Sequence, residues 1–217
     1  PCFSYELATI VQEGIEDMYG KNNDNYYYLT LMNENYHHPE RPKNATNEAI
    51  MSGCYKFLDA KQPSVRLLAS GVTLRFALEA SEILEKMDIS CEVWSVTSFN
   101  ELARGGLAAE RSRYVNDNND LSYVEKCFLD VLPTIAVSEY MRNYPEQIRR
   151  FINGNYICLG TDGFGRSDTR ENLRKFFEID KNNIVYASLI ASGNEKLAKS
   201  YAEENKLALN KDHPWQK

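Results

Sequence analysis

The residues of this sequence that could bind a phosphate lie in a glycine-rich turn between an apolar stretch and an amphipathic helix. Gly163, Gly165 and Arg166 form the turn, and free N–H groups at the start of such a helix can hold an anion. The spacing matches neither G-x-x-x-x-G-K-[ST] nor G-x-G-x-x-G, and the carboxylates of Asp162 and Asp168 would repel a phosphate. The composition therefore favours a tight strand-to-helix turn, with an anion site at these residues as the less favoured alternative.

A second group of polar side chains follows the apolar stretch Tyr26–Met32, in the order Asn33, Glu34, Asn35, Tyr36, His37, His38. Ligands of α/β proteins bind in the crevice at the carboxyl ends of parallel strands, so this segment is the best candidate to face a ligand. Two adjacent histidines cannot both point the same way in an extended segment. That geometry favours the alternative of a polar loop that makes only turn and interface hydrogen bonds.

No other set of residues has the spacing of a known catalytic or metal site. The sequence has no G-x-S-x-G nucleophile motif, no helix-borne histidine pair and no C-x-x-C pair among its five cysteines. Asp162 could serve as an acid or base, although an Asp between Thr and Gly more often hydrogen-bonds its own turn. We therefore predict no catalytic residue, no metal ligand and reduced thiols in a cytoplasmic protein.

The composition excludes two classes of partner. The 217 residues are 43% hydrophobic and carry a net charge of −6, without a long cluster of Lys and Arg. Such a chain is a poor candidate for binding nucleic acid or a membrane surface. No apolar run approaches the roughly 20 residues that a membrane span needs. The first residue is Pro1 rather than Met, and we expect a piece of a longer protein.

The elements that would position these residues follow from the apolar periodicity. From residue 65 onward predicted strands and helices alternate, which calls for a mainly parallel sheet with helices on both faces, a three-layer α/β/α fold. A polar stretch with two prolines, 33–47, is predicted to be a linker, and 49–58 is either a hairpin or a short helix. Gly105-Gly106 is expected to interrupt one helix. The predicted strands cover 26–32, 65–70, 91–96, 133–137 and 155–159, and the predicted helices cover 5–19, 73–87, 98–113, 139–152, a stretch capped by Ser167 or Asp168, and 182–209.

Four stretches of the chain resemble, in the same order, one known family. They are YYYLTLMNENYHHPERP, LLASGVTLRFALEASEIL, VWSVTSFNELAR and LGTDGFGRSDTRENLRKFFEID. Each is similar to the carboxyl-terminal region of the homodimeric, acetyl-transferring pyruvate dehydrogenases, the first component of the bacterial complex, in the transketolase-like superfamily. The resemblance covers about residues 4 to 195. The chain departs from the family pattern at Gly105, at Ser112 and over 112–132, where the resemblance implies dimer packing.

The resemblance implies a thiamine diphosphate enzyme that decarboxylates pyruvate and passes the acetyl unit to a lipoyl group of dihydrolipoyl acetyltransferase. It implies that residues 1–45 finish a pyrimidine-binding domain and 46–217 form a dimer-building carboxyl-terminal domain. Thiamine diphosphate and Mg²⁺ would be bound outside this segment, which alone would be inactive. Asn33, Asn35 and His37 become candidates for lining the substrate channel. The alternative hypothesis is a stand-alone anion-binding or regulatory module of the same fold.

Overall fold

The computed structural model of the protein describes residues 1–216 and is built around one five-stranded sheet. The strand order is β1-β3-β2-β4-β5, in which β1 is antiparallel to β3 and the other neighbours are parallel. β2 is buried at all five positions because it lies in the middle of a sheet that is covered on both faces. The strands are β1 (Cys54–Leu58), β2 (Val65–Ala69), β3 (Cys91–Val96), β4 (Thr134–Val137) and β5 (Tyr156–Leu159).

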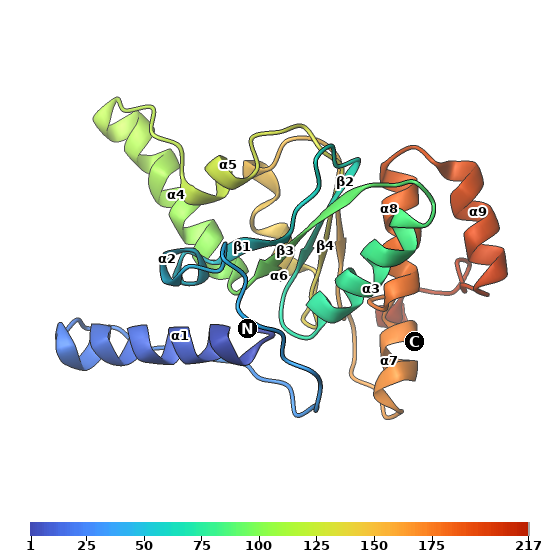
Figure 1. The fold of residues 1–217 in the computed structure, drawn as a ribbon, viewed down its shortest axis with the longest axis horizontal. Helices are drawn as coiled ribbons and strands as arrows, with labels where there is room; N and C mark the ends of the chain where they lie inside the picture. The colour runs from blue at the N-terminus through green and yellow to red at the C-terminus, as the bar shows by residue number, and fades with distance from the viewer. Residues whose placement is uncertain (217) are drawn as a thin grey trace.

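Helices cover both faces of the sheet, as Figure 1 shows. On one face, Leu67, Val93 and Ile135 pack with α3 (Thr73–Glu85) and α8 (Lys181–Ala191). On the other face, apolar side chains of the strands pack with α4 (Phe99–Asn116), α5 (Tyr123–Cys127) and the residues that follow α6 (Asn143–Glu146). The three-layer α/β/α prediction is confirmed.

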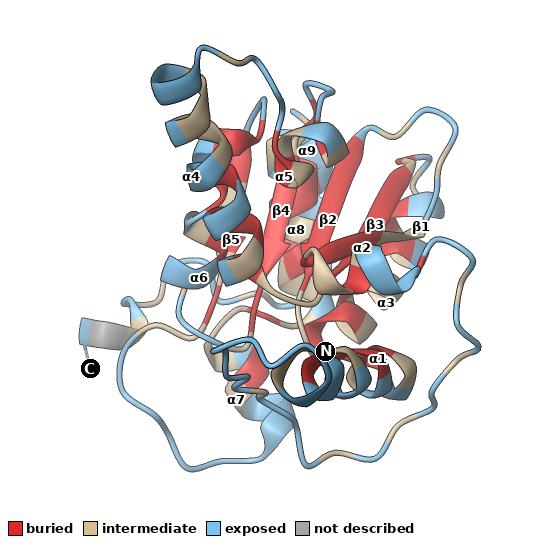
Figure 2. Cartoon of the chain, turned by 90° about the vertical axis from the view of Figure 1, so that its left-hand side faces the viewer, coloured by how far each residue is buried: buried red, intermediate tan, exposed pale blue. Residues whose placement is uncertain are grey.

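The amino-terminal helix, α1 (Ser4–Ile15), lies beside the sheet rather than over one of its faces (Figures 1 and 2). It continues as a π-helical turn to Gly20 and contacts α2 (Asn47–Met51). Phe3 is its N-cap residue, and the carboxylate of Glu6 accepts hydrogen bonds from the N–H groups of Cys2 and Phe3. Ile10, together with residues of α2 and β1, forms a small apolar core of its own.

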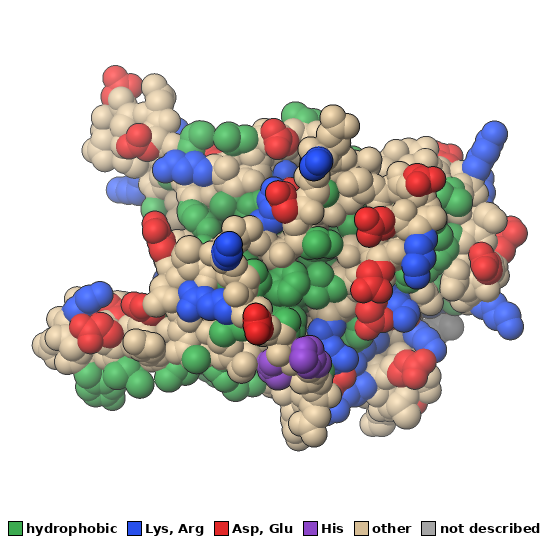
Figure 3. Space-filling view, viewed as in Figure 1, with side chains coloured by type: hydrophobic (Ala, Val, Ile, Leu, Met, Phe, Trp, Pro, Cys, Tyr) green, Lys and Arg blue, Asp and Glu red, His purple; other side chains and the backbone are tan. Residues whose placement is uncertain are grey.

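The predicted strand at 26–32 is wrong. These residues form no regular element, and Tyr26 and Tyr28 are 89% and 84% exposed. A strand that is apolar on both faces needs a neighbouring strand and a cover on each side. Within the described residues the sheet ends at β1 and β5, and neither strand pairs with this segment. In the space-filling view, hydrophobic side chains gather along the lower edge of the part that carries α1 (Figure 3).

Three predicted helices have the wrong boundaries, and each error involves a glycine or a proline. α4 runs through Gly105-Gly106 without a break, and the predicted helix at 182–209 divides into α8 and α9 (Glu195–Glu204) at Gly193, whose φ is +79°. The predicted helix at 139–152 would place Pro145 in its interior, where proline removes a hydrogen bond. The chain forms instead the short α6 and a 3-10 turn, Arg149–Phe151. The prediction also missed α5, although Ser122 and Glu125 have the spacing of a capping box at its start.

The remaining elements agree with the predictions more closely. The segment 49–58 contains both a helix end and a strand, since α2 is followed directly by β1. The helix after the glycine-rich turn is α7 (Arg170–Phe176), and its cap is Thr169 rather than Ser167 or Asp168. The Oγ1 atom of Thr169 accepts a hydrogen bond from the N–H of Asn172 at 3.3 Å.

Candidate functional site

The candidate site lies at the carboxyl ends of β2 and β4. After β2 the chain returns through α3 on one face to β3, whereas after β4 it returns through α6 on the other face to β5. The two neighbouring strands therefore lead away in opposite directions, which makes the space between their ends the topological switch point of the sheet. In α/β proteins this is the usual position of a ligand crevice.

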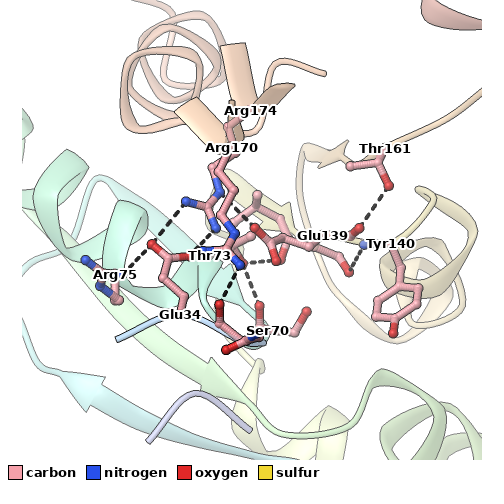
Figure 4. Close-up of polar contacts among 12 residues, drawn as sticks. Glu34, Ser70, Thr73, Arg75, Glu139, Tyr140, Thr161, Arg170 and Arg174 are labelled. Atoms are coloured by element: carbon pink, nitrogen blue, oxygen red, sulfur yellow. Dashed lines mark hydrogen bonds and ion pairs between the residues drawn. The ribbon is translucent and has the colours of Figure 1, made fainter. Parts of the chain in front are cut away.

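The carboxylate of Glu34 occupies this switch point and pairs with arginines from two helices (Figure 4). Its Oε2 lies 2.6 Å from Nη2 of Arg174 on α7, and its Oε1 lies 3.1 Å from Nη1 of Arg75 on α3. The hydrogen bond with Arg174 is the main reason why the pKa of Glu34 is lowered. Glu34 is therefore ionised and joins the segment after Met32 to the carboxyl-terminal half of the chain.

Arg174 also binds a second carboxylate, that of Glu139 after β4. Its Nε donates to Oε1 of Glu139 at 2.9 Å, and its guanidinium lies 4.8 Å from the ring centroid of Phe76. The Oγ1 of Thr161 donates to the backbone carbonyl of Glu139 at 2.9 Å and holds it against the end of β5. The buried Oε2 of Glu139 has no partner among the described residues, and burial raises the pKa of this carboxyl.

The segment around Glu34 alternates between anchored and exposed side chains. Like Glu34, Tyr36 is only partly exposed, and its hydroxyl donates to the carbonyl of Cys2 at 2.5 Å. The Nδ1 of His38 accepts a hydrogen bond from the N–H of Ser4 at 2.9 Å. This period of two is that of an extended chain, whose successive side chains point to opposite sides.

The three candidate channel residues are the other members of this alternation. The side chains of Asn33, Asn35 and His37 are all exposed. The backbone carbonyl of Asn33 accepts a hydrogen bond from Nη2 of Arg170 at 2.5 Å, which is a third arginine contact with the segment. The structure thus places the three candidates on one side of a short extended segment whose other side is anchored.

The glycine-rich turn lies apart from this arrangement and is held by its own contacts. The carboxylate of Asp162 accepts from the N–H of Arg142 at 2.9 Å and pairs with its Nε, which ties the turn to the segment after β4. The guanidinium of Arg166 lies 5.5 Å from the ring centroid of Phe176, and Gly163 turns the chain with φ at +95°. These contacts account for a structural turn, and the anion site at Gly163, Gly165 and Arg166 stays a prediction.

A separate buried ion pair joins β2 and β3 inside the sheet. Nε of Arg66 lies 2.5 Å from Oε1 of Glu92, and both residues are almost completely buried. Nζ of Lys56, on β1, lies 2.8 Å from the other oxygen of Glu92. The guanidinium of Arg66 lies 4.9 Å from the ring centroid of Phe128. The pair serves the sheet and does not reach the switch point.

The described residues also bear on metal, thiol and membrane chemistry. No group of three or more His, Cys, Asp or Glu among them could hold a metal ion. Burial raises the pKa of the Cys91 and Cys2 thiols to about 12, which leaves these sulfurs protonated. No helix of the described chain is both long and apolar enough to cross a membrane.

Sequence reasoning missed the arginines that hold the segment. Arg170 and Arg174 are four residues apart, so they lie on one face of a helix, and this spacing was the available signal. Nothing in the local sequence indicated that Arg75, about forty residues from Glu34, would reach the same carboxylate. The role of Glu139 was hidden by the expectation that it belonged to a helix.

Two family models match the chain. The model described as the transketolase-like C-terminal domain matches residues 53–180, more than half of the chain. The model described as the middle domain of the pyruvate dehydrogenase E1 component matches residues 1–39, which include the segment with Glu34. The boundary between the two matches falls in the polar stretch before α2.

Curated relatives with high similarity are pyruvate dehydrogenase E1 components. That of Pseudomonas aeruginosa is 45% identical over 199 residues, covering 88% of this chain and 22% of the relative. That of Cupriavidus necator is 41% identical and covers 99% of this chain and 25% of the relative, and that of Escherichia coli is 43% identical and covers 87% and 22%. The chain thus spans about a quarter of the length of the curated relatives that it matches.

Solved structures with a similar fold are transketolases. One from Pichia stipitis has a TM-score of 0.53 and 17% identity, covering 72% of this chain and 20% of that chain. One from Leishmania mexicana has a TM-score of 0.52 and 18% identity, covering 70% and 20%. At this level of identity the likeness concerns the fold alone.

Proposed function

Because the chain belongs to the transketolase-like C-terminal domain family and corresponds to the carboxyl-terminal region of pyruvate dehydrogenase E1 components, we propose that it is the dimer-building part of such an enzyme. The whole enzyme would decarboxylate pyruvate with thiamine diphosphate and Mg²⁺. It would then transfer the acetyl unit to the lipoyl group of a dihydrolipoyl acetyltransferase. The observation that carries the proposal is the 41–45% identity to E1 components over most of the chain.

Two domains of the parent enzyme would meet in this segment. The matches at residues 1–39 and 53–180 support our division into 1–45, the end of the pyrimidine-binding domain, and 46–217, the carboxyl-terminal domain. The exposed apolar side chains around Tyr26–Met32 also support it, since the rest of the first domain would cover them.

The cofactor would be bound outside this segment. A Mg²⁺ diphosphate needs oxygen ligands that are open to the metal. At the switch point both carboxylates, Glu34 and Glu139, bind arginine, and Asp162 in the glycine-rich turn binds Arg142. The residues present therefore do not fit the diphosphate, and no step of the reaction is assigned to them. Thiamine diphosphate would be supplied by the other domains of the enzyme.

The segment would contribute to the substrate channel through Asn33, Asn35 and His37. Their side chains are exposed together, and amide and imidazole groups can hydrogen-bond a 2-oxo acid carboxylate. Their backbone belongs to the stretch that matches the middle domain of the E1 component. We assign them contact with the substrate and no step of proton transfer.

The carboxyl-terminal domain would help to form a homodimer in the cytoplasm. Exposed apolar side chains occur on α4 and in the chain that follows it, namely Leu107, Val115, Leu129 and Val131. Apolar surface of this kind is typical of a protein interface. The hypothesis of a stand-alone anion-binding module has no comparable support, because the glycine-rich turn contains the carboxylate of Asp162, which would repel an anion.

The proposal is tested by comparing this segment with the longer protein that contains it. Release of CO₂ from pyruvate labelled at C1 is measured with thiamine diphosphate and Mg²⁺, and acetylation of a lipoyl domain is measured in parallel. We expect turnover by the longer protein, none by residues 1–217, and loss of turnover when the cofactor is omitted. Decarboxylation by the isolated segment, or a longer protein that ignores pyruvate, would overturn the proposal.

A further inference from the structure

The segment Asn33–His38 has no backbone hydrogen-bond ladder to fix its shape. It belongs to no helix or strand, and residues 25–40 form no regular element. A segment without such a ladder opens locally at low cost unless side chains hold it. Its conformation therefore depends on the side chains of its anchored side and on the groups that receive them.

The groups that receive the anchored side are mainly arginines. Arg174 and Arg75 bind the Glu34 carboxylate, and the guanidinium of Arg75 also lies 4.5 Å from the ring centroid of Tyr36. Arg170 donates to the carbonyl of Asn33. Figure 4 shows these arginines converging on Glu34 from α3 and α7. We call Arg75, Arg170 and Arg174 the arginine clamp.

Arg174 is the central member of the arginine clamp. Its side chain is only 10% exposed, and it binds Glu34 through both Nη atoms, at 2.6 and 3.3 Å, while its Nε binds Glu139. Only arginine offers several N–H donors in one rigid plane, so lysine could not bind both carboxylates in this manner. Glu139 in turn fixes the guanidinium to the end of β4, in the rigid sheet.

We propose that Arg174 is a positioning residue, which through Glu34 holds the segment Asn33–His38 so that Asn35 and His37 face the substrate. This inference rests on the proposed function, because it assigns those residues to the channel. The carboxyl-terminal domain would thereby act on the chemistry without touching the substrate. It would set the geometry of a segment that the sequence comparison assigns to the neighbouring domain.

A purely structural role for Arg174 predicts a different outcome. The end of α7 also packs through Phe177, which lies against the apolar core that contains residues of α3 and α8. If Arg174 only stabilised α7, its loss would lower the melting temperature and leave the surviving folded enzyme with normal kinetics. If it positions the segment, the folded enzyme itself becomes slower.

The experiment uses the longer enzyme and the variants Arg174→Met, Arg174→Lys and, as a matched control, Lys175→Met. Lys175 is on the same helix and pairs with Glu171 in solvent at 2.6 Å. Three quantities are measured for each: Tm, the rate of chymotrypsin cleavage after Tyr36 in the native enzyme, and kcat/KM for pyruvate. Faster cleavage after Tyr36 with unchanged cleavage elsewhere would locate the effect.

We expect Arg174→Met to speed cleavage after Tyr36 by about tenfold or more, because cleavage follows the population in which the segment is released. We expect its kcat/KM to fall by roughly 10- to 100-fold, because a displacement of about 1 Å near a substrate can cost that much. Arg174→Lys should fall between Arg174→Met and wild type, and Lys175→Met should match wild type. Unchanged cleavage in Arg174→Met, or faster cleavage with unchanged kcat/KM, would overturn the inference.

The two proposals fail in different ways. If the wild-type enzyme does not decarboxylate pyruvate, the proposed function is wrong, while the cleavage rate after Tyr36 still reports whether Arg174 holds the segment. If the wild type is active and Arg174→Met has the wild-type cleavage rate and kcat/KM, the proposed function stands and the positioning role is refuted.

Discussion

The adjacent glycines of α4 allow a test in which each is the control for the other. Gly105 is exposed, and a Cβ added there would meet no atom within 4 Å. Gly106 is buried, and a Cβ added there would lie 2.5 Å from Cε2 and 2.6 Å from Cζ of Phe151. Phe151 is itself a core residue, 7% exposed, so its ring has little room to move.

Replacement of either glycine by alanine gains about 0.5–1 kcal/mol from helix propensity. Only Gly106→Ala also overpacks the core, at a cost of about 1–3 kcal/mol. The propensity gain is common to both variants, so Gly105→Ala should be more stable than Gly106→Ala by about 1–3 kcal/mol. Equilibrium urea unfolding followed by circular dichroism measures the difference. Equal stabilisation by the two substitutions would refute the packing argument.

Three further predictions concern buried and titratable groups. Arg66→Met should lower the free energy of unfolding by about 3–5 kcal/mol in urea, because it leaves the buried carboxylate of Glu92 without its closest partner; a loss below about 1 kcal/mol would contradict this. Glu34→Gln should make the free energy of unfolding less dependent on pH in acid. The hydrogen bond with the α7 arginine lowers the pKa of Glu34, so the ionised carboxylate stabilises the fold above the ordinary pKa of 4.5, and this stabilisation is lost as pH falls through the lower folded-state pKa. An acid limb identical to wild type would show that the ion pair adds no stability. Iodoacetamide should modify Cys127 before Cys91, since a neighbouring thiol lowers the pKa of Cys127 whereas burial raises that of Cys91 to about 12; peptide mapping that finds the reverse order would contradict the burial argument.

The parallel strands could be predicted because their sequences are mostly apolar. Val65–Ala69 and Cys91–Val96 are buried at every position, including Arg66 and Glu92, which pair with each other. Tyr26–Met32 has the same pattern but no neighbouring strand within the described residues. An apolar pattern therefore predicts that a segment tends to be buried. It does not show whether the residues that would cover the segment lie within the same stretch of chain.

Glycine and proline misled the prediction because their effect depends on packing. Gly106 lies in the middle of a helix since the ring of Phe151 needs the space that a side chain would fill, whereas Gly193 adopts a positive φ and ends α8. Both glycines occur within a helical pattern. Only the tertiary contacts distinguish them, and these contacts join residues far apart in the sequence.

The candidate site was predictable in part. The rule that adjacent side chains point to opposite sides separates His37 from His38, and the structure shows that separation. The arginine clamp could not be found in this way, because Arg174 is 140 residues from Glu34. Only the strand order, which places the ends of β2 and β4 together, brings them into contact.

The central claim is that Arg174 and Glu34 act on catalysis through one contact, and a double-mutant cycle on kcat/KM for pyruvate in the longer enzyme tests it most directly. The variants are Arg174→Met, Glu34→Gln and the two combined. If both residues act by holding the same segment, the double variant should lose no more kcat/KM than the worse single variant. Losses that multiply in the double variant would contradict the claim.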